Sequence, residues 1–236
     1  MDASAAALYI VATPIGNLGD ITLRALETLR KVDIVAAEDT RQTLKLLNAH
    51  GITKRLISCR AANESQSAGG IIALLERGQS VAYCTDAGTP GVSDPGAVLV
   101  AAVRKAGFPV VPLPGASALA ALVSVGGFSG RTVTFDGFLS VKSGKRQRRV
   151  DELLKRSEAF ILYESPFRII KLLKAIADTE SDRKILVARE MTKTHEEFLS
   201  GTALEVLNDL QSRPIIKGEF AVLVSGTNSD DDEVKE

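Results

Sequence analysis

Three turns that are rich in glycine and proline each follow an apolar run of the chain. They are TPIGNLGD at 13–20, TDAGTPGVSDPG at 85–96 and PLPGASA at 112–118. Glycine lets the backbone approach a ligand closely, and proline holds a turn open without a bulky side chain. A single turn of this kind is ordinary. Three of them together favour a site at which backbone groups bind a small molecule.

The usual metal and nucleotide signatures are missing from the sequence. No G-x-G-x-x-G follows the first apolar run, and no G-x-x-x-x-G-K-[ST] occurs anywhere. Cys59 and Cys84 form no C-x-x-C pair, and His50 and His195 are the only histidines, which argues against a structural zinc site or a histidine-rich metal site. The few cysteines, together with the lack of a signal peptide or a long apolar segment, predict a cytoplasmic protein.

Strands alternate with helices along most of the chain, in two series. This pattern predicts an α/β fold with two domains and mainly parallel sheets. We expect an N-terminal domain over 1–118, a C-terminal domain over 119–226 and an acidic, disordered tail over 227–236. The expected strands cover 8–13, 33–37, 55–59, 80–84 and 109–113 in the first series and 131–139, 159–164, 184–190 and 219–226 in the second.

The three turns follow three strands of the first series. Ligands of open α/β sheets bind beyond the carboxyl ends of the strands, so we expect the turns to converge there. Some polar residues near them have structural interpretations as well. Asp94, before Pro95, and Asp39 are expected to cap the helices that follow them. The carboxylate of Asp86 is suited to accept hydrogen bonds from loop amides.

Seven short motifs occur in order along residues 8–226. They are TPIGNL (13–18), AAEDTR (36–41), DAGTPGVSDPG (86–96), PLPGASA (112–118), YESP (163–166), AREMTK (188–193) and KGEF (217–220). This set resembles the tetrapyrrole methylase superfamily, and within it the bacterial 2′-O-ribose methyltransferases of 16S rRNA.

The resemblance implies a class III methyltransferase fold with S-adenosylmethionine in a cleft between the domains, commonly in a homodimer. It also implies methylation of a cytidine ribose in the decoding region of 16S rRNA, within the small ribosomal subunit. The cofactor-binding positions that it assigns are Ile15, Thr85, Asp86, Thr89, Ser117, Ala118, Tyr163, Glu164 and Met191.

The sequence departs from the family pattern at histidines. Gln42, Arg60, Ala62 and Phe167 stand where family members usually carry histidine in DTRHT, HEHNE and ESPHR. These departures bear on the RNA substrate more than on the cofactor, because the cofactor turns are intact.

Methyl transfer to a ribose hydroxyl needs an aligned acceptor and benefits from a general base or a nearby cation. Glu38, Glu190 and Lys193 are candidates from their motif positions, and the sequence does not choose among them. Residues 1–226 have a net charge of +4 (28 basic and 24 acidic), whereas the tail has −4 (one basic and five acidic).

A basic segment over 142–149 is the candidate RNA contact. Five of its eight residues are basic: Lys142, Lys145, Arg146, Arg148 and Arg149. A solvated start of a helix would explain the same residues. Three function classes therefore stay open: an RNA methyltransferase, a methyltransferase acting on a tetrapyrrole or another small molecule, and an inactive RNA-binding module.

Overall fold

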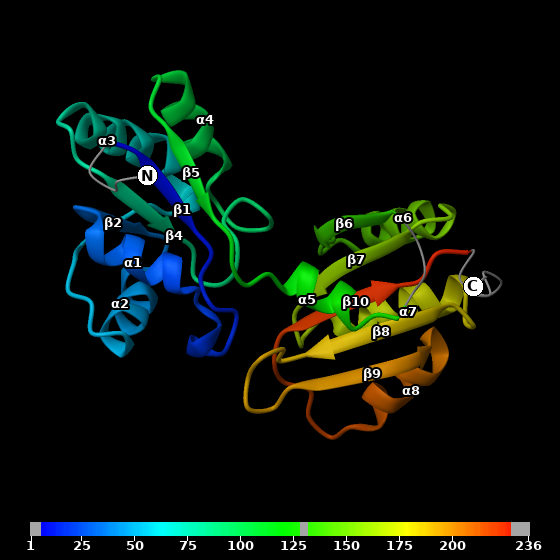
Figure 1. Cartoon of the computed structure of the whole chain (residues 1–236). Coiled ribbons are helices and arrows are strands. Elements are labelled where there is room, and N and C mark those ends of the chain that lie inside the picture. Colours follow the sequence, from blue (N-terminus) through cyan, green and yellow to red (C-terminus); the bar gives the residue numbers. More distant parts are fainter. Residues whose placement is uncertain (1–5, 128–131, 228–236) are drawn as a thin grey trace, which may run out of the picture. The chain divides into compact units, whose positions relative to one another are not determined.

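The computed structural model describes residues 6–127 and 132–227. The chain divides into two compact units, Met1–Ser117 and Ala118–Glu236, and each is described by itself (Figure 1). This division falls one residue before the expected domain boundary, and all of the expected acidic tail except Thr227 lies outside the described residues. None of the described helices is long and apolar enough to cross a membrane.

The first unit contains a five-stranded sheet with the order β3-β2-β4-β1-β5. Its described pairings, β1 with β4 and β5 and β2 with β3 and β4, are all parallel. The strands are β1 (Leu8–Val11), β2 (Ile34–Ala37), β3 (Arg55–Ser58), β4 (Val81–Cys84) and β5 (Val110–Leu113). The helices are η1 (Leu18–Asp20), α1 (Leu23–Lys31), α2 (Thr40–Ala49), η2 (Ala61–Asn63), α3 (Glu64–Glu76) and α4 (Ala97–Lys105).

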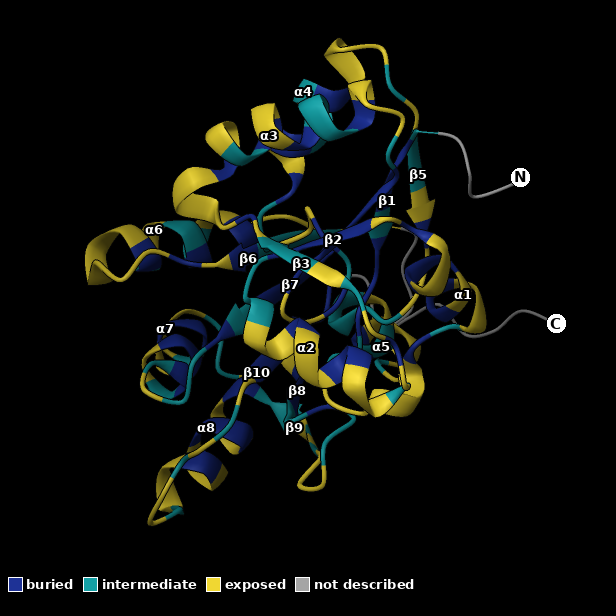
Figure 2. Ribbon diagram, turned by 90° about the vertical axis from the view of Figure 1, so that its left-hand side faces the viewer, coloured by how far each residue is buried: buried dark blue, intermediate teal, exposed yellow. Residues whose placement is uncertain are grey.

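Side chains of successive strand residues point to opposite faces, so this sheet has a core on each face. In β4, Ala82 and Cys84 pack with residues of α1 and α2, whereas Val81 and Tyr83 pack with residues of α3 and α4. Figure 2 shows the central strands β1, β2 and β4 largely buried, whereas the edge strands β3 and β5 are partly exposed. Cys84 is fully buried among apolar residues, as expected for a structural cysteine.

The chain leaves the adjacent strands β1 and β4 in opposite directions. From β1 it passes over β4 to β2, and from β4 it passes over β1 to β5. Because such crossovers are right-handed, the helices that follow these two strands lie on opposite faces, and the two turns diverge at the carboxyl ends. This is the topological switch point, where ligands bind in open α/β sheets.

The second unit has a five-stranded sheet with the order β6-β7-β10-β8-β9. The strands β6, β7 and β8 run in one direction, and β10 and β9 run in the other. The strands are β6 (Val133–Phe138), β7 (Ala159–Glu164), β8 (Lys184–Arg189), β9 (Glu197–Thr202) and β10 (Phe220–Val224). The helices are α5 (Ala118–Ser124), α6 (Ser143–Leu154), α7 (Ile169–Thr179) and α8 (Ala203–Ser212).

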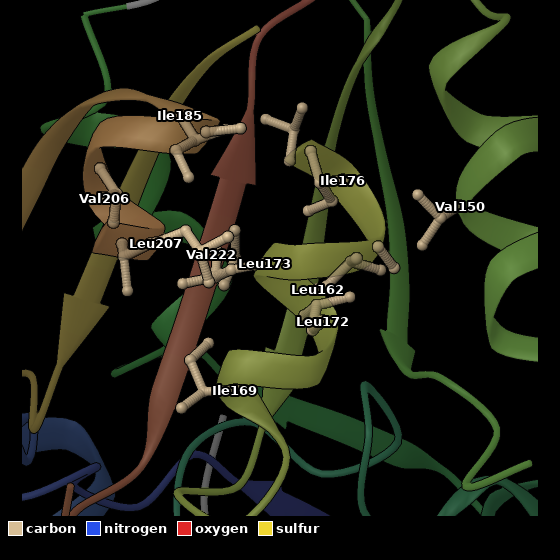
Figure 3. Packing of buried hydrophobic residues seen from close by; sticks show 14 of the residues in the cluster. Val150, Leu162, Ile169, Leu172, Leu173, Ile176, Ile185, Val206, Leu207 and Val222 are labelled. Carbon is tan, nitrogen blue, oxygen red and sulfur yellow. The ribbon is translucent and has the colours of Figure 1, made fainter. Parts of the chain in front are cut away.

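One large apolar cluster covers a face of the second sheet. Val150 from α6, Leu172 from α7 and Leu207 from α8 pack on Leu162 of β7 and Val222 of β10 (Figure 3). The α/β fold class is thus confirmed. Sequence analysis missed two elements, the short helix α5 and the edge strand β9, whose EFLSGT sequence lacks a buried apolar run.

Helix caps were predicted with mixed success. The carboxylate of Asp39 accepts a hydrogen bond from the amide of Arg41 (2.9 Å) and caps α2 as expected. The prediction for Asp94 is wrong, because α4 begins after Gly96. The buried carboxylate of Glu64, at the start of α3, accepts hydrogen bonds from the amides of Gly96 and Leu99, both at 2.9 Å.

Replacing Glu64 by alanine should destabilise the first unit. The change leaves two buried amides at the start of α4 without an acceptor, so we expect a loss of about 2–3 kcal/mol in the free energy of unfolding. Glu64→Gln, which keeps an acceptor oxygen, should lose less. Urea unfolding measures both, and Glu76→Ala, at an exposed position of the same helix, should change the unfolding free energy by less than about 0.5 kcal/mol. Equal effects of Glu64→Ala and Glu76→Ala would contradict this capping role.

Candidate functional site

The turns that follow β1 and β4 are joined by their backbones. The amide of Thr13 donates to the carbonyl of Gly88 and the amide of Gly88 donates to the carbonyl of Thr13, both at 2.9 Å. The hydroxyl of Thr13 also donates to the carbonyl of Thr85 (3.1 Å). These hydrogen bonds hold the turn after β1 against the turn after β4 at the switch point, and they fix the backbone around Thr85.

The turn after β5 is tied to the same structure. The hydroxyl of Thr89 donates to the carbonyl of Ala116 (3.1 Å), directly before Ser117. Gly88 has φ +77°, and a Cβ atom there would lie 3.3 Å from Cγ2 of Ile15. We call the mutual hydrogen bonds of Thr13 and Gly88 the backbone bridge. Five residues of the predicted cofactor set lie in the turns around it: Ile15, Thr85, Asp86, Thr89 and Ser117.

The hydroxyl of Thr85 has no protein partner. Thr85 is 1% exposed, and no group in the described part of the chain makes a hydrogen bond with its Oγ1 atom. A buried hydroxyl without a partner costs free energy, so it is a natural place for a ligand group to bind.

Acidic side chains lie beside these turns, at the carboxyl ends of β2 and β4. The amide of Asp86 donates to Glu38 Oε2 (3.3 Å), and Asp86 Oδ1 accepts a hydrogen bond from the amide of Asp39 (3.0 Å). Burial raises the pKa of Glu38, and the charges of Asp86, Asp94 and Asp39 raise it further, against the opposing effect of the Asp86 amide. This concentration of negative charge favours a positively charged ligand group.

In the second unit, Tyr163, Glu164 and Met191 lie where β7 and β8 end. We call this end of the strands an edge of the sheet. Tyr163 and Glu164 end β7, and Phe220 of β10 pairs with both Glu164 and Arg189. Met191 follows β8 at this edge and is buried. The buried Glu164 receives the Ser165 amide (2.8 Å) and the Arg168 guanidinium (2.6 Å) at Oε1, while its Oε2 has no partner among the described residues.

Two of the three catalytic candidates form an ion pair with each other. Nζ of Lys193 lies 2.8 Å from Glu190 Oε1 and 2.9 Å from Glu219 Oε2. The hydrogen bond from Lys193 lowers the pKa of Glu190. Burial lowers the pKa of Lys193, but its hydrogen bonds to Glu190 and Glu219 outweigh that effect, and the net shift is upward. Neither group is therefore tuned to act as a base near neutral pH.

The backbone conformation and contacts that hold this ion pair were not predicted from the sequence. Glu190 has φ +51°, and its Oε1 atom also accepts a hydrogen bond from the amide of Glu219 (2.9 Å). Gly218 permits this approach, because a Cβ atom there would lie 2.5 Å from Cγ of Glu190. The glycine of the KGEF motif is the sequence signal for this contact.

The five basic residues of segment 142–149 differ in exposure and in ion pairing. Lys142, Lys145 and Arg148 are exposed. Arg149 is held by Asp136 (2.7 Å) and Glu152 (2.9 Å), so its charge is already paired. Arg146 is 8% exposed, because it lies on the inner face of α6 with Val150. Only the first three side chains are placed to meet an RNA without rearrangement.

The residues that replace family histidines all lie at the surface. Gln42, Arg60, Ala62 and Phe167 are exposed, and each follows the carboxyl end of a strand. These substitutions therefore leave both cores unchanged.

A polar pocket of about 460 Å³ lies at the opposite edge of the second sheet, where β8 begins and β10 ends. Its lining includes Glu180, Arg183, Lys184 and Ser225. None of the predicted site residues lines it, and the guanidinium of Arg183 is already bonded to Glu180 (2.7 Å) and to the carbonyl of Ser225 (3.1 Å).

Comparisons with known proteins agree with this arrangement. Residues 7–207 match the family model of tetrapyrrole (corrin/porphyrin) methylases. The chain is 48% identical to a "Ribosomal RNA small subunit methyltransferase I" of Borrelia garinii over 223 residues, 94% of this chain and all of that protein. It is 49% identical to a protein of the same name from Neisseria meningitidis serogroup B, over 87% of this chain and 70% of that protein.

Solved structures show the same fold. The structure described as the methyltransferase CobJ superposes with a TM-score of 0.70 at 18% identity, covering 94% of each chain. The family match spans both units, including the tied turns of the first sheet and the YESP and AREMTK edge of the second. This chain therefore belongs to the tetrapyrrole methylase family.

Proposed function

We propose that this chain transfers a methyl group from S-adenosylmethionine to the ribose 2′-oxygen of a cytidine in the decoding region of 16S rRNA. The observation that carries the proposal is the 48% identity over the whole length of a relative named as a methyltransferase of small-subunit ribosomal RNA. The substrate is a partly or fully assembled small subunit, and the site of action is the cytoplasm, where subunits are assembled. A homodimer is part of the proposal through the family resemblance.

The described residues suit S-adenosylmethionine in two ways. The turns of the first sheet present backbone groups and the unpaired hydroxyl of Thr85, which match the polar edges of an adenosine or an amino acid. The acids around Glu38 match a sulfonium and an ammonium group, both of which are positive. Tyr163, Glu164 and Met191 of the second unit are further proposed cofactor-binding residues, assigned by the family resemblance.

The cofactor, when bound, supplies an activated methyl group on a sulfonium. The protein must then hold the acceptor hydroxyl in line with it and exclude water. The tied turns suit the positioning task, because their backbone is fixed by hydrogen bonds before any ligand arrives. Such preorganisation reduces the entropy that is lost in reaching the reactive geometry.

Among the three candidates, we assign the role of general base to Glu38. Burial raises the pKa of Glu38, which increases its proton affinity relative to an ordinary glutamate. Glu190 and Lys193 are assigned a positioning role, because their ion pair holds the backbone that leads into Met191.

The wild-type protein should methylate small subunits that lack the modification. A 2′-O-methyl group blocks alkaline cleavage at the following phosphate, so one new gap should appear in an alkaline ladder of the rRNA after incubation with S-adenosylmethionine. Subunits already modified by the protein serve as the control and should accept no further methyl. Transfer of labelled methyl to a uroporphyrinoid or precorrin, with none to rRNA, would overturn the assignment.

Comparing Gly88→Ala with Gly91→Ala should distinguish an effect on the cofactor site from the effect of backbone strain alone. Both glycines have φ near +80°, but an added Cβ meets Ile15 only at Gly88 and meets open space at Gly91. Gly88→Ala should weaken binding of S-adenosylmethionine by about tenfold, or about 1.4 kcal/mol, because the added Cβ atom presses on Ile15 and displaces the turn from the bound geometry.

Titration calorimetry measures the affinity of both variants. Gly91→Ala carries the same backbone cost and should bind within about twofold of wild type. Circular dichroism confirms that each variant is folded. Wild-type affinity in a folded Gly88→Ala variant would remove the turn after β4 from the cofactor site.

The pH dependence of methylation should report Glu38. A base must be deprotonated, and the pKa of Glu38 is raised, so kcat/KM should fall with decreasing pH at a higher pH than an ordinary glutamate would give. Glu38→Gln should lower kcat/KM by about 100-fold or more and should abolish this acidic limb. Glu190→Gln is the control and should keep the limb. An unchanged limb in Glu38→Gln would assign the base elsewhere.

A further inference from the structure

Three large apolar side chains are exposed at one edge of the second unit. Phe138 is 57% exposed, Val141 is 74% exposed and Phe167 is 88% exposed. Single exposed apolar residues are common, but aromatic residues gathered beside a charged segment are typical of a binding surface. Neither phenylalanine is used in the proposed cofactor site.

The backbone explains why these residues share an edge. β6 and β7 are parallel neighbours, and Phe138 pairs with Tyr163 at their carboxyl ends. Arg168 then joins the two loops that follow, because its guanidinium donates to the carbonyl of Leu139 (3.3 Å) and pairs with Glu164 (2.6 Å). Phe138 directly precedes Leu139, and Phe167 directly precedes Arg168.

Phe138 is held in place by another aromatic ring. Its ring meets the Tyr163 ring edge-on, with centroids 5.9 Å apart and an angle of 69° between the planes. The ring of Phe135 also meets Tyr163 edge-on, with centroids 4.9 Å apart. An exposed ring with a fixed orientation loses little entropy when a flat ligand stacks on it.

Exposed cationic side chains follow directly after Val141 in the sequence. Lys142 precedes α6, which has no acidic residue in its first turn, and Lys145 and Arg148 follow on its exposed side. Within residues 132–227 none of these three cations has an ion-pair partner, in contrast to Arg149. The amino end of a helix adds further positive potential.

Arg146 is a different case from these three cations. It is 8% exposed on the inner face of α6, and its Nε atom is buried without a hydrogen-bond partner in the described structure. Arg146 is therefore not counted among the exposed cations of this surface.

We propose that Phe138, Val141, Lys142, Lys145, Arg148 and Phe167 form a platform for an unpaired segment of the RNA substrate. The bases stack on the two phenylalanines, and the phosphates meet the three exposed cations and the start of α6. Aromatic rings beside unpaired cations are the combination by which proteins hold single-stranded nucleic acid. A platform made of cations alone would bind any polyanion, whereas the aromatic rings select exposed bases.

The proposal rests on the proposed function, since it concerns the RNA of that reaction, and it adds the surface that holds the acceptor strand. Its test uses the full chain and a variant with a reporter. The sequence contains no tryptophan, so Phe167→Trp supplies a single fluorophore on the platform. Binding of an unstructured RNA oligonucleotide should quench this fluorescence, because bases stack on the indole.

Affinity for the oligonucleotide should fall by about tenfold in Phe167→Ala and in Phe138→Ala, the scale of losing one stacked base. Ile215→Ala, which removes another exposed apolar side chain of this unit, is the matched control and should bind as wild type. The affinity for S-adenosylmethionine should stay unchanged in Phe167→Ala and Ile215→Ala. Phe138→Ala removes a ring contact of Tyr163, so circular dichroism checks that this variant remains folded.

The cations are tested by the salt dependence of binding. Replacing Lys142, Lys145 and Arg148 by glutamine should reduce the slope of log affinity against log salt by about 2, since each phosphate contact in a single strand contributes about 0.7. Glutamine at Lys155 and Arg156, at the other end of α6, removes exposed charge without touching the platform and should change the slope little.

The two proposals fail differently. Methylation of rRNA by the wild type together with unchanged RNA affinity in both alanine variants would overturn the platform and leave the function standing. Failure of the wild type to methylate rRNA would overturn the function and the platform with it. A fluorescence response of Phe167→Trp to small subunits that survives ribonuclease treatment would assign this surface to a ribosomal protein and overturn the platform.

Discussion

The backbone bridge between Thr13 and Gly88 is the constraint on which the candidate cofactor site depends. It joins two turns whose chains leave for opposite faces of the sheet, so without it the carboxyl ends of β1 and β4 would present two separate loops. The Thr13 hydroxyl also fixes the carbonyl of Thr85, and Ile15 lies close to Gly88, whose φ of +77° favours glycine. A site made of backbone groups is thereby formed before a ligand binds.

Electrostatics differs between the described edges of the two sheets. In the first unit, burial raises the pKa of Glu38, and the charges of Asp86, Asp94 and Asp39 raise it further, although Asp39 is itself paired with Arg41 (2.6 Å). In the second unit, Glu190 is neutralised by Lys193, and the exposed cations lie before and along α6. A methyl transfer to RNA joins a cationic donor to a polyanionic acceptor, and each edge has the charge that suits one of them.

The sequence was sufficient for the elements whose signals are local. Apolar runs bounded by glycine and proline located the strands of the first sheet, and the Gly/Pro turns follow three of them, as predicted. The cap of α4 was missed because Glu64 reaches it from another helix, and no local pattern reveals such a contact. Arg146 was grouped with its neighbours by composition, although the period of the helix turns it inward with Val150. β9 was missed because an edge strand needs no continuous apolar run.

The positions at which this chain departs from its family are exposed, whereas the turns that match the family are closely packed. The turns of the first unit are tightly packed, because a Cβ atom would lie 3.3 Å from Ile15 at Gly88 and 3.0 Å from Ala12 at Gly115, so substitutions there disturb the turns. Gln42, Arg60, Ala62 and Phe167 are exposed, and changing them costs the fold little. Residues at these exposed positions can therefore change without disturbing the turns. On the proposed platform, the phenyl ring at position 167 offers a flat surface for stacking but lacks the hydrogen-bonding groups of an imidazole, so it suits the face of a base better than its edge.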